Sequence, residues 1–144
     1  MTINDCIKFA NENVVCYIAT IDGDQPRVRA FGLWFADDTG FYFSSGTPKA
    51  VCQQLKKNPK TEVCFFSPEP QPAGTMMRIT GEVEFLNDIA LSTRLLEERP
   101  FLKDMGATGP EDPNISIFRI ASGEARFWSM ADAMSGKPVE ILKF

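Results

Sequence analysis

Residues 14–45 read VVCYIATIDGDQPRVRAFGLWFADDTGFYFSS and set the architecture of the chain. Three segments of this run, at 14–21, 27–36 and 41–45, are rich in β-branched and aromatic residues, which favour strands. They are separated by DGDQP and DDTG, whose glycine, proline and aspartate residues are typical of tight turns. Strands joined by such short loops pair antiparallel, so the sequence predicts a three-stranded antiparallel meander.

Helices and further strands are predicted on both sides of this meander. Thr2 and Asp5 form a capping-box pattern, which predicts a helix over residues 3–11. Thr47 is the expected N-cap of a short helix ending near residue 57, because Pro48 suits the first helical position. Gly81 indicates a bulge or a close backbone approach within its strand. Further strands are predicted at 61–67, 75–86, 115–120 and 124–130. A third helix is predicted to end near residue 99. The tail, residues 139–144, is expected to form an edge strand or a packed arm.

Six or seven antiparallel strands and three helices predict a mainly β fold in a single domain, residues 1–144. A small closed or nearly closed β-barrel with flanking helices suits this pattern, because closure removes exposed sheet edges. A flat sheet with helices on one face is the alternative. The chain is long enough to bury ~70% of its unfolded surface, so it needs no disulfides. We expect its four cysteines to be reduced and mostly buried.

The composition excludes several classes of function. The chain has no histidine, so catalytic triads, HExxH zinc sites and histidine-ligated haem are excluded. It has no CxxC motif, and we expect no metal site. A formal net charge of −4 argues against nucleic-acid binding. No run approaches the ~20 apolar residues of a membrane span, and no signal peptide is evident, so we expect a cytoplasmic protein.

The junction between the third strand and the following helix, FYFSSGTPK at 41–49, is the strongest candidate for a binding site. Ser44, Ser45 and Thr47 supply hydroxyl groups, and Lys49 lies near the start of the helix. Hydroxyls, free backbone N–H groups and a lysine at a helix N-terminus are the elements of a phosphate site. The alternative is an ordinary helix start with a solvated lysine.

Arg27 and Arg29 form a second candidate anion site. They are two residues apart in one strand, so their side chains lie on the same face, followed by Phe31. In an antiparallel hairpin, Ser44 and Ser45 are expected to lie opposite the two arginines, so both signals would converge. The alternative is a pair of solvated arginines at the rim of the sheet.

Phe127-Trp128 is a third feature of interest, because an indole can stack on a flat ring. The alternative for Trp128 is a place in the core. No paired carboxylates are arranged for acid–base catalysis, and no GxGxxG motif occurs.

With these residues in view, the chain resembles the pyridoxamine 5′-phosphate oxidase-like family of FMN-binding split barrels over about residues 5–130. The resemblance is carried by the order of CYIAT, the DGxP turn, PRVRAFG, FYFSSGTPKAV, KNPKTEVCFF and MRITGEVEFL. It implies a Greek-key split barrel and a homodimer with FMN at the subunit interface. It further implies these cofactor-binding residues: Arg29, Thr47 and Lys49 at the phosphate, Arg27, Ser44 and Ser45 nearby, Ala30 and Phe31 at the flavin ring, and Trp128 reaching the cofactor from the partner subunit.

Two departures argue against oxidation of pyridoxamine 5′-phosphate itself. Pro48 replaces the basic residue that such oxidases carry before the lysine, and the C-terminal segment has neither the arginine nor the histidine that grips their substrate. The resemblance is therefore to a smaller, general or stress-protein-like member. We expect an FMN-dependent oxidoreductase, working as a reductase on an unknown small molecule, with no catalytic side chain identified. The alternatives are a flavin-binding redox sensor or cofactor store, or a different cofactor such as a deazaflavin or haem.

Overall fold

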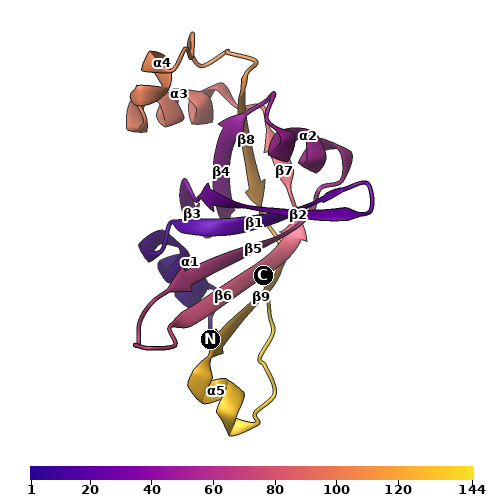
Figure 1. Cartoon of the computed structure of the whole chain (residues 1–144). Coiled ribbons are helices and arrows are strands. Elements are labelled where there is room, and N and C mark those ends of the chain that lie inside the picture. Colours follow the sequence, from indigo (N-terminus) through magenta and orange to yellow (C-terminus); the bar gives the residue numbers. More distant parts are fainter.

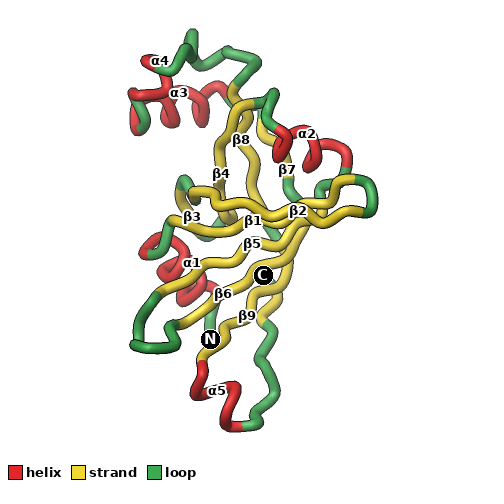
Figure 2. The backbone as a smooth tube through the Cα atoms, viewed as in Figure 1, coloured by secondary structure: helices red, strands yellow, loops and turns green.

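A computed structural model describes all 144 residues and contains ten strands and five helices (Figures 1 and 2). The strands are β1 (Val15–Asp22), β2 (Gln25–Gly32), β3 (Phe35–Asp37), β4 (Gly40–Gly46), β5 (Lys60–Ser67), β6 (Thr75–Glu82), β7 (Glu84–Leu86), β8 (Ile115–Ile120), β9 (Gly123–Ser129) and β10 (Leu142–Lys143). The helices are α1 (Ile3–Glu12), α2 (Ala50–Lys57), α3 (Ile89–Glu98), α4 (Phe101–Asp104) and α5 (Met130–Ser135).

The strands form two antiparallel sheets that share one core. One sheet has the order β10-β9-β6-β5-β1-β2 and the other the order β3-β4-β8-β7. The core contains Ile18 and Val63 from the first sheet and Phe41 and Phe118 from the second, all fully buried. The predicted mainly β split barrel is therefore confirmed, with the barrel open rather than closed. Helices α3 and α4 lie at one end of the molecule and α5 at the other (Figure 1).

The strand count exceeds the predicted six or seven because two long strands are each divided between the sheets. After β2 the chain turns a corner, where Leu33 N donates to Val14 O and Trp34 N donates to Tyr42 O, both at 2.8 Å. Between β6 and β7, Val83 N donates to Pro59 O at 2.8 Å. The tail supplies the short edge strand β10, which pairs with β9.

The largest fully buried side chains of the core are four phenylalanines, Phe41, Phe43, Phe65 and Phe118. Phe43 and Phe118 stack with ring centroids 5.5 Å apart, and Phe31 stacks on Phe118 at 6.2 Å. Burying one such side chain stabilises the fold by about 1.5–3 kcal/mol. All four cysteines are free thiols, and three of them are buried.

Of the two predicted helix N-caps, one is confirmed and the other is wrong. The capping box of α1 is confirmed, since Asp5 N donates to Thr2 Oγ1 and Thr2 N donates to Asp5 Oδ2. The expected cap of α2 is wrong, because its N-cap is Lys49 and no side chain caps the helix. The Thr47 hydroxyl instead donates to Pro113 O and pairs with Ser116 Oγ, each at 2.8 Å, so it ties β4 to the loop before β8.

Candidate functional site

A cavity of about 480 Å³ lies where the ends of β2 and β4 meet the start of α2 and the α3–α4 segment. Its volume falls in the range of small-molecule and cofactor sites. The apolar part of its lining includes Phe31, Leu95 and Leu102. The polar part includes Ser44, Ser45, Gly46, Lys49 and Arg99. The cavity therefore suits a ligand with a flat apolar part and an anionic part.

Lys49 lies at an open helix N-terminus. No side chain caps α2, and its first turn contains no acidic residue. Lys49 also forms none of the ion pairs in the structure. The partial positive charge of the helix end and the ammonium group thus add together without a counter-ion. This end of the cavity therefore has the chemical features of a helix N-terminal anion site.

The Ser45 hydroxyl is buried and forms no hydrogen bond of standard geometry. Its polar neighbour is the Cys52 thiol: burial raises the pKa of this thiol, and weak hydrogen bonds with the hydroxyls of Ser45 and Ser116 partly offset this effect. A buried hydroxyl without a partner costs about 1–3 kcal/mol. The hydroxyl nevertheless adds a polar group to the lining around Lys49, and this combination suits a phosphate group.

Arg99 is a second cation of the cavity, and sequence reasoning did not identify it. It is the C-cap of α3, and it donates to Ser44 Oγ at 3.2 Å and to Leu33 O at 3.3 Å. Burial lowers the pKa of its guanidinium, an effect that Glu98 partly opposes. The only available signal was a basic residue at a helix C-terminus before a proline, which is common for other reasons.

Asp112 is the only carboxylate that lines the cavity. Its oxygens accept backbone hydrogen bonds from Thr108 at 3.0 Å and Asn114 at 2.9 Å. These bonds lower the pKa of Asp112, so it remains ionised and shapes the loop before β8.

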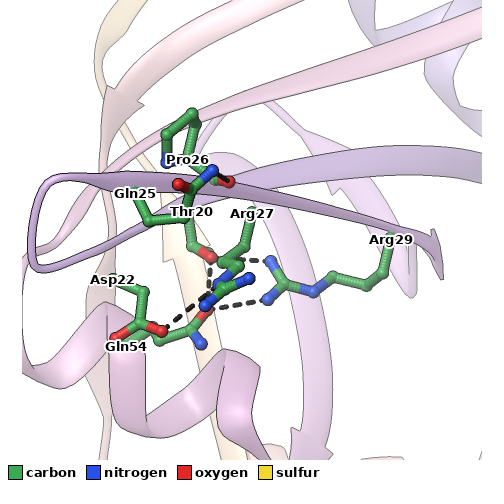
Figure 3. A network of polar contacts seen from close by, with 7 residues as sticks. All are labelled: Thr20, Asp22, Gln25, Pro26, Arg27, Arg29 and Gln54. Atoms are coloured by element: carbon green, nitrogen blue, oxygen red, sulfur yellow. Dashed lines mark hydrogen bonds and ion pairs between the residues drawn. The ribbon is translucent and has the colours of Figure 1, made fainter.

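The two predicted arginines lie on the inner face of β2, on the same face as Phe31 but outside the cavity wall. Arg27 forms an ion pair with Asp22, with 3.2 Å between Nε and Oδ2. The Arg29 guanidinium reaches Thr20 and Gln54, both at 2.7 Å (Figure 3). The expected pairing of Ser44 and Ser45 with the arginine-bearing strand is wrong, because β4 pairs with β3 and β8. The two serines instead meet the Phe31 end of β2.

The remaining predicted residues lie apart from the cavity within one chain. The Ala30 side chain faces the outer side of the sheet, opposite Tyr17. Thr47 lines a separate groove beside β7. Trp128 lies in β9 and lines a third cavity of about 690 Å³ beside α5 and residues 137–140. The structure thus brings together Phe31, Ser44, Ser45 and Lys49 and adds Arg99.

No three His, Cys, Asp or Glu side chains gather as a metal-binding group. None of the helices combines the length and the apolar character that crossing a membrane requires.

Together, these features define a split-barrel protein with a basic cavity at a strand–helix junction. The family model described as pyridoxamine 5′-phosphate oxidase matches residues 5–129. The chain therefore belongs to the pyridoxamine 5′-phosphate oxidase family. This confirms the resemblance stated from the sequence.

Solved structures give the same result for the fold. A NimC/NimA family protein from Clostridium acetobutylicum is 29% identical, with a TM-score of 0.79 and coverage of 98% of this chain and 92% of that one. General Stress Protein 26 from Bacillus anthracis is 16% identical over 100% of both chains, with a TM-score of 0.74. PhzG from Burkholderia lata, solved with tetrahydrophenazine-1-carboxylic acid, is 15% identical, with a TM-score of 0.72 and coverage of 99% and 89%. Among curated proteins, no sequence matches significantly.

Proposed function

We propose that this chain is an FMN-binding oxidoreductase that reduces a small molecule with electrons from an external donor. One observation carries the proposal: the unpaired Lys49 at the open start of α2 and the unpartnered Ser45 hydroxyl share a cavity with the aromatic ring of Phe31. That combination matches a ligand with a phosphate at one end and a flat ring system at the other.

The residues of the chain would divide the work of binding. Lys49, Ser45 and the free N–H groups of α2 would hold the phosphate, with Arg29 supporting this end. Phe31 and the backbone at Ala30 would lie against the ring, and Arg99 would hold an anionic group in the same cavity. Bound FMN supplies hydride transfer at its N5 atom.

We further propose a homodimer with FMN at the subunit interface. The outer face of the six-stranded sheet exposes Val15, Tyr17, Val28 and Phe66 by 44–70%, which is unusual for a sheet face without a partner. On the same face Arg78 and Arg126 are cross-strand neighbours, and the Nε atoms of both are buried without a hydrogen-bond partner. A second copy would cover the apolar side chains and supply acceptors for the exposed parts of these two guanidinium groups. Trp128, two residues after Arg126 on this face, would then reach the cofactor of the other subunit.

A flavin-binding module without turnover, such as a redox sensor or cofactor store, is the second candidate. It is favoured by the lack of a free carboxylate in the cavity, since Asp112 accepts two backbone hydrogen bonds. Oxidation of pyridoxamine 5′-phosphate is not proposed, because Pro48 stands before the lysine and the chain contains no histidine.

The proposal is tested first by identifying the bound cofactor and then by measuring how fast electron donors reduce it. Protein purified from cells should be yellow, or should become so with added FMN, and mass spectrometry of the released ligand should show FMN. A deazaflavin or haem in its place, or no uptake of FMN, would contradict the proposal. Stopped-flow mixing with NADH and NADPH then separates the candidates. Rapid flavin reduction supports the oxidoreductase, whereas none with either donor supports the module.

A further inference from the structure

We infer that Gln54 keeps the positive charge of Arg29 free for a phosphate group and thereby makes the site selective for phosphorylated ligands. This inference rests on the proposed function, because Arg29 is assigned to the phosphate end of the cofactor. It concerns a residue that the family resemblance does not assign.

Arg29 is held entirely by neutral acceptors. Its Nη2 donates to Gln54 Oε1 at 2.7 Å, and its Nη1 donates to Thr20 Oγ1 at 2.7 Å and to Ile18 O at 3.4 Å. The Thr20 hydroxyl closes the triangle by donating to Gln54 Oε1 at 2.6 Å. Thr20 is only 2% exposed, so the arrangement is anchored in the core (Figure 3). These contacts fix the guanidinium without cancelling its charge.

The neighbouring arginine shows the contrast. Arg27 is paired with Asp22, and both side chains are about half exposed. Arg29 has no such carboxylate. Burial, and then the charge of Arg27, lower the pKa of Arg29, so both effects disfavour a charge that nothing in the chain neutralises. An incoming anion would be stabilised there, because it would supply the missing counter-charge.

Gln54 also joins Arg29 to the cavity. It follows Lys49 by five residues in α2, which corresponds to about 7.5 Å along the helix axis. Arg29 precedes Phe31 by two residues on the same face of β2. Two uncompensated cations thus lie against α2: Lys49 at its N-cap, and Arg29 of β2, which is bonded to Gln54. A dianionic phosphate held between them would interact with both, whereas a ligand without a phosphate would gain nothing from either.

The substitution Gln54→Glu would keep the hydrogen bonds around Arg29 but would remove the free positive charge. The glutamate carboxylate can accept the same hydrogen bonds from Arg29 and Thr20, but it would form an ion pair with Arg29 and neutralise the site. Gln54→Glu should therefore fold at least as stably as the wild type. The matched control is Gln71→Glu, the same change in an exposed position of the 68–74 loop.

The experiment titrates FMN and riboflavin, which differ by the phosphate, into the unliganded wild type, Gln54→Glu and Gln71→Glu, and follows flavin fluorescence. We expect the wild type to prefer FMN, Gln54→Glu to lose about tenfold in FMN affinity with riboflavin unchanged, and Gln71→Glu to behave as the wild type. An unchanged preference in Gln54→Glu, with the wild type preferring FMN, would overturn this inference and leave the proposed function intact.

Inorganic phosphate separates the two ideas further. If the wild type binds neither flavin, the proposed function is contradicted. The unfolding temperatures of the wild type and Gln54→Glu, each measured with and without phosphate, then test the role of Gln54. If phosphate stabilises the wild type but not Gln54→Glu, the inference is supported. If phosphate stabilises the two proteins equally, or stabilises neither, the inference is overturned.

Discussion

Arg99 Nη1 donates a hydrogen bond to Ser44 Oγ at 3.2 Å and thereby joins the end of α3 to the end of β4, across 55 residues of sequence. Its Nη2 donates to Leu33 O at the corner between the two sheets. One guanidinium thus fixes the outer wall of the cavity and places a positive charge in it.

Replacing Arg99 should therefore affect both the cavity and the ligand. Arg99→Met should weaken FMN binding by about tenfold or more, because a hydrogen bond to a charged group contributes about 1.5–3 kcal/mol. Arg99→Lys keeps the charge and should recover part of the loss. Fluorescence titration measures both variants. Wild-type affinity in Arg99→Met would show that this cation takes no part in binding.

Gly123 should be intolerant of any side chain. A Cβ atom there would lie 1.9 Å from Thr80 O, and the backbone of Gly123 exchanges two hydrogen bonds with Phe144. Gly123→Ala should therefore destabilise the fold by about 2–4 kcal/mol. Gly32→Ala is the control, because its Cβ would meet nothing within 4 Å. Urea unfolding measures the stability of both variants. Equal stability of Gly123→Ala and Gly32→Ala would contradict the prediction that position 123 cannot hold a side chain.

Stability should fall at alkaline pH because of the buried thiols. Burial raises the pKa of Cys16 to about 12 and that of Cys6 to about 11, from an ordinary value of 9.0. The folded chain holds these protons more tightly than the unfolded chain does. Their contribution to stability is complete below about pH 9 and is lost as the pH rises toward 11–12. Urea unfolding under reducing conditions measures the free energy of unfolding at each pH. Between pH 8 and 10.5 this free energy should fall less in Cys16→Ala than in the wild type. An equal fall in the two proteins would contradict this explanation.

The proposed dimer should depend on the outer face of the six-stranded sheet. Val28 is 70% exposed on that face, so Val28→Glu should place a charge in the interface and shift the protein toward monomers. Ala90→Glu adds the same charge at an exposed position of α3 and should remain dimeric. Sedimentation velocity with FMN present measures both. A wild-type monomer, or a Val28→Glu dimer as tight as the wild type, would exclude this interface.

Most of the fold could be predicted because its signals are local. The capping box of Thr2 and Asp5 and the run of β-branched residues in β1 depend only on near neighbours in sequence. The close approach predicted at Gly81 is also confirmed, since a Cβ there would lie 2.6 Å from Ser122 O. The corner at Leu33 was not predictable, because it depends on a hydrogen bond to Val14, which precedes β1 and is distant in sequence.

The candidate site shows the same division. The strand–helix junction at Ser44, Ser45 and Lys49 was visible as one continuous motif. Thr47 was misassigned because its hydroxyl bonds to Pro113, 66 residues away. Arg99 was missed because its place in the cavity depends on how α3 packs back on β4. Contacts between distant segments leave no periodic or compositional trace, so they emerge only in the folded chain.

The central claim is that Lys49 and Arg29 hold the phosphate of FMN. It is tested most directly by titrating FMN into the wild type, the double variant Lys49→Ala/Arg29→Ala and the control Lys57→Ala, which removes an exposed lysine at the other end of α2. The account predicts tight binding by the wild type and the control, and a loss of about a hundredfold or more in the double variant, since each charged contact contributes about 1.5–3 kcal/mol. Equal FMN affinity in all three proteins would contradict it.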